Sequence, residues 1–166
     1  MAQKSPTGAM PALRFARVET ALGPMWVVES DLGVAGVTRD EPFGSFQRRF
    51  PGSPLEPADL DGSWIDRALD GGTLPPIDVR GLSSFDARVF EVVRDVPPGE
   101  TVTYGEVAAL IGSPGAARAV GGAMSRCPLF PAVPCHRVVR ASDGWSGWGG
   151  DDRLKRRLLA AERATS

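Results

Sequence analysis

The sequence predicts a mixed α/β protein of the α+β class, with a small antiparallel sheet in its first half and mostly helices in its second. Short β-rich runs separated by tight turns fill residues 13–39, and the apolar period becomes helical after residue 82. Of the 166 residues, 42% are hydrophobic and 23% are charged, as is typical of soluble globular proteins. This length suits one ordinary domain, or two small domains that share an interface.

Three strands are expected first. They are residues 13–19 (LRFARVE), 25–30 (MWVVES) and 34–39 (VAGVTR). The tight turns between these runs predict an antiparallel meander. The polar and small residues 1–10 that precede them predict a loose arm.

Two short helices are expected between the meander and the second half. Residues 44–50 (GSFQRRF) favour a helix, and the Pro, Gly and Asp content of residues 51–62 (PGSPLEPADLDG) favours a loop. The next helix is expected in residues 63–72 (SWIDRALDGG), with Ser63 as its N-cap and Gly71 as the residue that ends it. Residues 71–84 (GGTLPPIDVRGLSS) then predict a linker.

The second half predicts a longer helix, a helix pair and a final helix. The longer helix is capped by Ser83 or Ser84 and stopped by Pro97-Pro98-Gly99, and its apolar face comprises Phe85, Val89, Val92, Val93 and Val96. Residues 103–112 and 116–126 flank the turn SPG and predict a helix-turn-helix. The last helix is expected at Asp151 to Glu162, with an inner face made by Leu154, Leu158 and Leu159.

Composition and charge exclude several classes of protein. No apolar run is long enough to span a membrane, and the first residues lack the apolar stretch of a secretory signal. Two cysteines cannot build a disulfide framework, so a reducing, cytoplasmic location is expected. The net charge is −1, but residues 83–166 carry 11 basic against 9 acidic side chains. That excess is a mild indication of a polyanionic partner. It is well below the excess of basic residues that is typical of an obligate nucleic-acid binder.

The only histidine, His136, directly follows Cys135 in the stretch AVPCHRVVR. A free thiol has a pKa of about 8.5, and an imidazole that takes its proton makes it a strong nucleophile. In a regular strand the two side chains point to opposite faces, so reaction requires a turn at Pro134 or a bridging water. A buried structural cysteine beside a surface histidine is the alternative.

Two other chemistries are conceivable for the same pair. Cys127, Cys135 and His136 offer three metal ligands, where a closed zinc site uses four and a different spacing, so no metal is expected. A Cys–His hydrolase is permitted by the single histidine, but no motif supports it.

The helix expected at residues 116–126 (AARAVGGAMSR) is almost without side chains. Its adjacent glycines, Gly121 and Gly122, each cost roughly 1 kcal/mol relative to Ala inside a helix. Such a smooth face permits either tight packing of another helix or close approach of a ligand to the backbone.

The motif PCHRVV, preceded by TYGEVAALIGSPGAARAVGGAM and followed by LKRRLLAAE, resembles the O6-alkylguanine-DNA alkyltransferases, also called methylated-DNA–protein-cysteine methyltransferases. The resemblance runs from about Phe85 to Glu162 and continues more weakly upstream. It implies that Cys135 attacks the alkyl carbon on guanine O6 and keeps the alkyl group as a thioether, so that each molecule acts once, with no cofactor and no metal.

The resemblance also assigns roles around the nucleophile, which is expected to be ionised at rest. His136 draws the thiol proton through a water, and Glu162 orients His136. Tyr104 donates toward the departing base, and Lys155 assists the charge balance near the thiolate. The alternative for Tyr104 is that its ring packs in the core with its hydroxyl hydrogen-bonded. The alternative for Lys155 is that it lies on a solvent-exposed face of its helix.

The resemblance further implies that the partner is double-stranded DNA bearing alkylated bases. The small-residue helix enters the minor groove through Ala116, Ala117, Ala119, Gly121 and Gly122, and Arg118 takes the place of the extruded nucleotide. A base inside a duplex cannot present its O6 to a thiol, so rotation by roughly 180° into a pocket is required. The base and alkyl pocket is expected to comprise Met124, Val138, Trp145, Trp148 and Gly149.

Three positions depart from the family pattern. Cys127 stands where the family usually has an asparagine that tethers the active segment, and a thiol is a weaker hydrogen-bonding group. Trp148 replaces a typical tyrosine, and Gly149 replaces a small hydroxyl residue. These changes leave the preferred alkyl group, and any repair of O4-alkylthymine, open.

By resemblance, residues 1–80 form a ribonuclease H-like α/β domain and residues 81–166 a winged helix-turn-helix-like domain with the DNA-binding and active sites. The junction is expected near Gly81. A monomer is expected, with cooperative assembly on DNA left open. The second hypothesis is a non-enzymatic alkyltransferase-like protein that binds lesions, although such proteins generally lack the cysteine.

Overall fold

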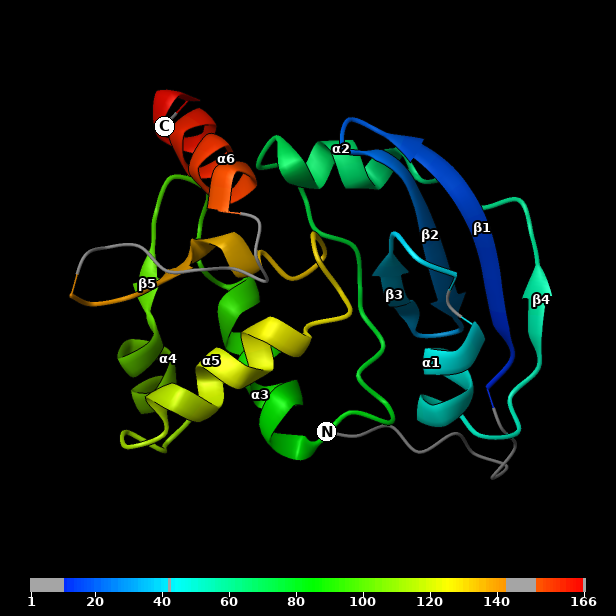
Figure 1. Cartoon of the computed structure of the whole chain (residues 1–166), viewed down its shortest axis with the longest axis horizontal. Helices are drawn as coiled ribbons and strands as arrows, with labels where there is room; N and C mark the ends of the chain where they lie inside the picture. Colours follow the sequence, from blue (N-terminus) through cyan, green and yellow to red (C-terminus); the bar gives the residue numbers. More distant parts are fainter. Residues whose placement is uncertain (1–10, 42, 143–151, 166) are drawn as a thin grey trace.

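The chain folds into a sheet flanked by short helices and a second, mostly helical body (Figure 1). A computed structural model describes residues 11–41, 43–142 and 152–165. The loose arm expected at residues 1–10 lies outside the described residues. The prediction of a mixed α/β protein with an N-terminal sheet is confirmed.

The expected meander is confirmed. Strands β1 (Leu13–Thr20), β2 (Gly23–Ser30) and β3 (Gly33–Thr38) pair antiparallel in sequence order. A fourth strand, β4 (Leu55–Pro57), pairs parallel with the outer edge of β1. The prediction of a loop throughout residues 51–62 was therefore wrong at these three residues. Pro57 is tolerated because β4 is an edge strand, and only the tertiary pairing makes so short a segment a strand.

Helices α1 (Phe43–Arg49) and α2 (Ser63–Leu69) follow the expected pattern. Gly71 ends α2 with a φ of 79°, a conformation that favours glycine. Ser63 is not the N-cap: Gly62 holds that position, and the Asp61 carboxylate accepts a hydrogen bond from the Ser63 N–H at 2.9 Å. Asp61, two positions before Ser63, therefore supplies the side-chain acceptor at the start of α2 that was predicted to come from Ser63.

The second half begins with α3 (Ser84–Arg94), which Ser83 caps by accepting from the Asp86 N–H. The helix ends before Val96, so Val96 does not belong to its face as predicted. Strand β5 (Val102–Thr103) leads into α4 (Tyr104–Leu110), and Thr103 and Glu106 form a capping box at the start of α4.

The remaining elements surround the cysteine. Helix α5 (Ala117–Arg126) packs on α4, which confirms the predicted helix pair. A single 3₁₀ turn, η1 (Cys135–Arg137), precedes β6 (Val138–Val139), which pairs parallel with β5. The last helix, α6 (Asp152–Thr165), buries Leu154, Leu158 and Leu159 as predicted. No helix in the described ranges has the length and apolarity needed to cross a membrane.

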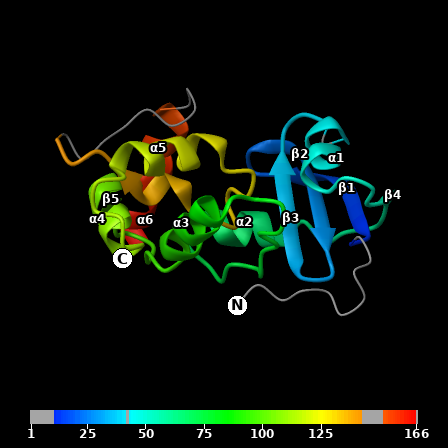
Figure 2. The same cartoon turned by 90° about the horizontal axis from the view of Figure 1, so that it is seen from below.

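The β3 edge joins the sheet to the segment that precedes Cys135. Val34 exchanges backbone hydrogen bonds with the 71–84 linker, and the Val37 N–H donates to the Pro128 carbonyl at 2.8 Å. One apolar cluster runs from Val27 and Val37 in the sheet to Cys135 and the helices around it. Figure 2 shows the sheet at one end of the molecule and α4 and α5 at the other.

Candidate active site

Cys135 begins η1 directly after Pro134, at the turn that the sequence predicted. Its side chain is only 1% exposed and lies in the main apolar cluster. A hydrogen bond between the Cys127 and Cys135 thiols, together with burial, raises the pKa of Cys135 well above its ordinary value, although the charge of Lys155 acts in the opposite direction. The resting residue is therefore a protonated thiol, and the expectation of an ionised sulfur at rest was wrong.

His136 and Glu162 form a buried pair across 26 positions of sequence. The His136 Nε2 lies 2.7 Å from a Glu162 carboxylate oxygen, and both side chains are at most 2% exposed. Helix α6 thus folds back onto the PCHR segment, as the predicted role of Glu162 required. Burial alone raises the pKa of Glu162, but hydrogen bonds from His136 and Arg137 outweigh it and lower that pKa to about 2.

The other ring nitrogen of His136 is positioned to accept a proton. Burial lowers the pKa of His136 despite the opposing effect of Glu162, so the ring is neutral at neutral pH. A neutral ring that donates from Nε2 to the Glu162 carboxylate carries its lone pair on Nδ1. In the part of the chain that the structure describes, this buried Nδ1 has no hydrogen-bond partner.

Arg137 is a site residue that the sequence reasoning missed. Its Nε and Nη2 donate to the Glu162 carboxylate at 2.8 to 3.2 Å, and its Nη1 donates to the Val96 carbonyl at 2.9 Å. The Gly99 N–H donates to the same carboxylate at 3.3 Å. The side chain is almost fully buried, so it fixes Glu162 against the turn that follows α3. Only its place beside His136 in the motif could have indicated this role.

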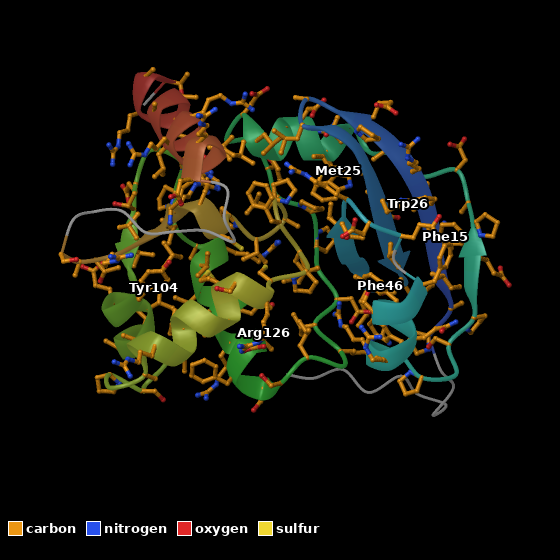
Figure 3. The ribbon with its side chains drawn as sticks, viewed as in Figure 1. Phe15, Met25, Trp26, Phe46, Tyr104 and Arg126 are labelled. Atoms are coloured by element: carbon orange, nitrogen blue, oxygen red, sulfur yellow. The ribbon has the colours of Figure 1, made fainter. Side chains whose placement is uncertain are left out.

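Lys155 is fully buried, which rules out the alternative of a solvated helix face. Its Nζ donates to the Val138 carbonyl at 2.6 Å and contributes a positive charge near Cys135. Tyr104 is half-buried at the start of α4, beside α5 (Figure 3). A Cβ at Gly121 would lie 4.0 Å from the Tyr104 ring, so this part of α5 lies beside the phenol.

An open cavity of about 520 Å³ lies beside Tyr104 and α5. Its lining comprises Tyr104, Gly105, Ala117, Arg118, Gly121, Arg140, Ala141 and Ser142. Met124 and Val138, which were predicted to line the pocket, are instead buried in the same apolar cluster as Cys135. The predicted pocket residues Trp145, Trp148 and Gly149 lie outside the described residues.

The two interpretations of the small-residue helix both apply to α5, on different faces. Val120, Ala123 and Met124 are buried and pack inward, whereas Arg118 and Ala119 are exposed. Ala116 is the N-cap rather than the first helical residue, and Ala116, Ala117, Gly121 and Gly122 are half-buried. Arg126, at the other end of the helix, pairs with Asp86 of α3 at 3.2 Å. The exposed face thus carries Arg118 among small residues, with Arg126 at its C-terminal end close to Gly122.

Within the described residues, no cluster of three or more His, Cys, Asp or Glu side chains could hold a metal ion. The arrangement around Cys135 therefore consists of a buried thiol, a neutral imidazole, an ionised carboxylate and two buried cations. This set can move a proton from sulfur to nitrogen and stabilise the resulting imidazolium with Glu162.

Comparison with known proteins places the chain in a family. Residues 84–164 match the model of the 6-O-methylguanine DNA methyltransferase DNA-binding domain. The methylated-DNA–protein-cysteine methyltransferase of Mycolicibacterium paratuberculosis is 50% identical over 90 residues, which is 54% of each chain. The matched region thus spans about half the length of that curated relative.

Other matches extend over nearly the whole chain. The enzyme of the same name from Salmonella typhimurium is 33% identical over 88% of this chain and 93% of its own. A crystal structure of Mycobacterium tuberculosis OGT in complex with DNA is 30% identical, with a TM-score of 0.74 over 92% of this chain and 94% of that one. The chain belongs to the methylated-DNA–protein-cysteine methyltransferase family.

Proposed function

We propose that the protein repairs DNA by transferring the alkyl group of O6-alkylguanine in duplex DNA irreversibly to the Sγ of Cys135. The observation that carries the proposal is the buried His136–Glu162 pair, which leaves one imidazole nitrogen unpartnered next to the cysteine in sequence. The names of the relatives, which describe transfer from methylated DNA to a protein cysteine, support the same reaction.

The reaction is a displacement at the alkyl carbon. A bond forms between the Cys135 sulfur and that carbon, while the bond from carbon to guanine O6 breaks and its electron pair remains on the base. The thiol proton passes through a bridging water to Nδ1 of His136, and Glu162 stabilises the imidazolium that forms. Tyr104 supplies a proton to the departing guanine, and its phenolate is reprotonated by the His136 imidazolium through solvent, so the net change is one proton moved from sulfur to the base.

The resting thiol makes the nucleophile selective. Because the pKa of Cys135 is raised, the sulfur reacts slowly with adventitious electrophiles that lack access to the site. Deprotonation by His136 at the moment of reaction supplies the thiolate only when a substrate is in place. The buried ammonium of Lys155 favours that anion.

Helix α5 is proposed to present the DNA-binding face. Its exposed small residues permit close approach to the minor groove, whose hydrogen-bond code is degenerate, so repair is independent of sequence context. Arg118 fills the place of the flipped nucleotide, and the cavity beside Tyr104 receives the base. In this proposal residues 81–166 supply both functions, and residues 1–80 support the segment before Cys135.

The test is to incubate the protein with a duplex oligonucleotide that carries one O6-methylguanine and to map the modification by mass spectrometry. We expect one methyl group per molecule, located on Cys135. The two cysteines provide matched variants: Cys135→Ser abolishes transfer, whereas Cys127→Ser still accepts the methyl group. An unmodified Cys135 contradicts the proposal, and tight lesion binding without transfer supports the lesion-binding alternative.

A further inference from the structure

The two cysteines of the chain meet beside the nucleophile. Cys127 follows the last residue of α5, and Cys135 is the first residue of η1. Their thiols form a hydrogen bond with one another, and Cys127 packs against the apolar cluster that contains Cys135. Neither is in a disulfide. The position at which the family pattern has asparagine thus provides a second sulfur in contact with the reactive one.

The segment between the two cysteines is held in place by its own hydrogen bonds and by the sheet. The Val37 N–H of β3 donates to the Pro128 carbonyl at 2.8 Å, directly after Cys127. The Val133 N–H donates to the Leu129 carbonyl at 3.0 Å, and the Cys135 N–H donates to the Val133 carbonyl at 2.8 Å. Backbone hydrogen bonds therefore hold the segment that connects the two cysteines.

The two sulfurs differ in their access to solvent. Cys135 is 1% exposed, whereas Cys127 is only half-buried. The Arg49 guanidinium, which donates to the carbonyls of Ala35, Asp78 and Arg80, also interacts electrostatically with Cys127. Because Cys127 is the more exposed of the two, a small oxidant from solvent reaches it before Cys135.

We propose that Cys127 and Cys135 form a reversible intramolecular disulfide when the protein meets hydrogen peroxide. The peroxide oxidises the Cys127 thiol to a sulfenic acid and is itself reduced to water. The Cys135 sulfur then attacks the Cys127 sulfur, an S–S bond forms, and the S–OH bond breaks with release of a second water. A dithiol reductant reverses the reaction by thiol–disulfide exchange.

The consequence for repair rests on the proposed function of Cys135. The disulfide removes the nucleophile while peroxide is present, so the oxidised protein accepts no alkyl group. It also protects Cys135, because a sulfur held in a disulfide is not available for oxidation to the irreversible sulfinic acid and is recovered as a thiol on reduction. For a protein whose nucleophile works once, that protection preserves an unused molecule.

The test uses the full chain, reduced and then freed of reductant, without DNA. After treatment with one equivalent of hydrogen peroxide, remaining thiols are blocked with N-ethylmaleimide and the intact mass is measured. We expect a monomer lighter by two hydrogen atoms that carries no maleimide, and a peptide in which Cys127 is joined to Cys135. Dithiothreitol is expected to restore two reactive thiols. Two maleimide additions after peroxide, or a disulfide-linked dimer, would overturn the proposal.

The matched variants are Cys127→Ser, which keeps a hydroxyl at the position, and Cys127→Asn, which restores the residue of the family pattern. In both, no disulfide is expected; prolonged exposure to excess peroxide is expected to oxidise Cys135 slowly to the irreversible sulfinic acid, so dithiothreitol restores less of its thiol than in the parent treated in the same way. Equal recovery in parent and variants contradicts the protective role. Alkyl acceptance by the reduced protein is measured separately, so failure of the repair function is distinguishable from failure of the disulfide.

Discussion

Replacement of Glu162 by Gln is expected to slow alkyl transfer to Cys135 by about a hundredfold or more. Four donors converge on the carboxylate, from His136, from two nitrogens of Arg137 and from the Gly99 N–H. An amide offers them one oxygen and adds two donors of its own. If its NH₂ group faces Nε2, the imidazole proton moves to Nδ1, which then cannot accept the thiol proton.

The measurement is single-turnover transfer from an O6-methylguanine duplex, with the rate followed as a function of pH. The parent is expected to hold its rate down to mildly acidic pH, because the lowered pKa of His136 keeps the ring neutral there. The same substitution at the exposed Glu56 of β4, Glu56→Gln, is the control and should leave the rate unchanged. A Glu162→Gln variant as fast as the control, with native thermal stability, argues against the proton relay.

Arg118→Ala is expected to slow transfer from duplex DNA by at least about tenfold while leaving transfer from free O6-benzylguanine unchanged. Arg118 is exposed on α5 and lines the cavity beside Tyr104, so it is placed to occupy the gap that a flipped nucleotide leaves. A free base needs no flipping and should not require this side chain.

Arg126→Ala is the matched control on the same helix. This change breaks an exposed ion pair with Asp86, which is worth little, so both rates should change by less than about fivefold. If Arg118→Ala slows alkyl transfer from duplex DNA and from the free base equally, the role of Arg118 in nucleotide flipping is contradicted. Such a result indicates a general effect on the pocket.

The regular elements were largely predictable because their signals are local. The β1–β2–β3 meander, the capped α3 and the α4–α5 pair follow from turn residues, caps and periodicity. Strand β4 was not predictable from the sequence, since its three residues become a strand only by pairing with β1. The division of the chain near Gly81 stays a prediction, because one apolar cluster includes residues from both halves.

The residues of the site were predictable as far as the resemblance identified them. Their pKa shifts and long-range contacts come only from the structure. Sequence placed Cys135, His136 and Glu162 in one reaction, but the raised pKa of the thiol depends on its burial and on Cys127. The four hydrogen bonds to the Glu162 carboxylate depend on Arg137, which lies 25 positions from Glu162 in the sequence. Long-range contacts of this kind leave no periodic signal in the sequence.

The most direct test is a crystal structure of the Cys135→Ser variant bound to a duplex that contains O6-methylguanine. We predict that the modified base lies outside the helix in the cavity beside Tyr104, with Arg118 in the base stack. The hydroxyl oxygen that replaces the Cys135 sulfur should then lie about 3–3.5 Å from the methyl carbon, in line with the bond to O6. A base that remains stacked in the duplex, or a substituted side chain still enclosed by the protein and out of reach of the methyl group, would contradict the account.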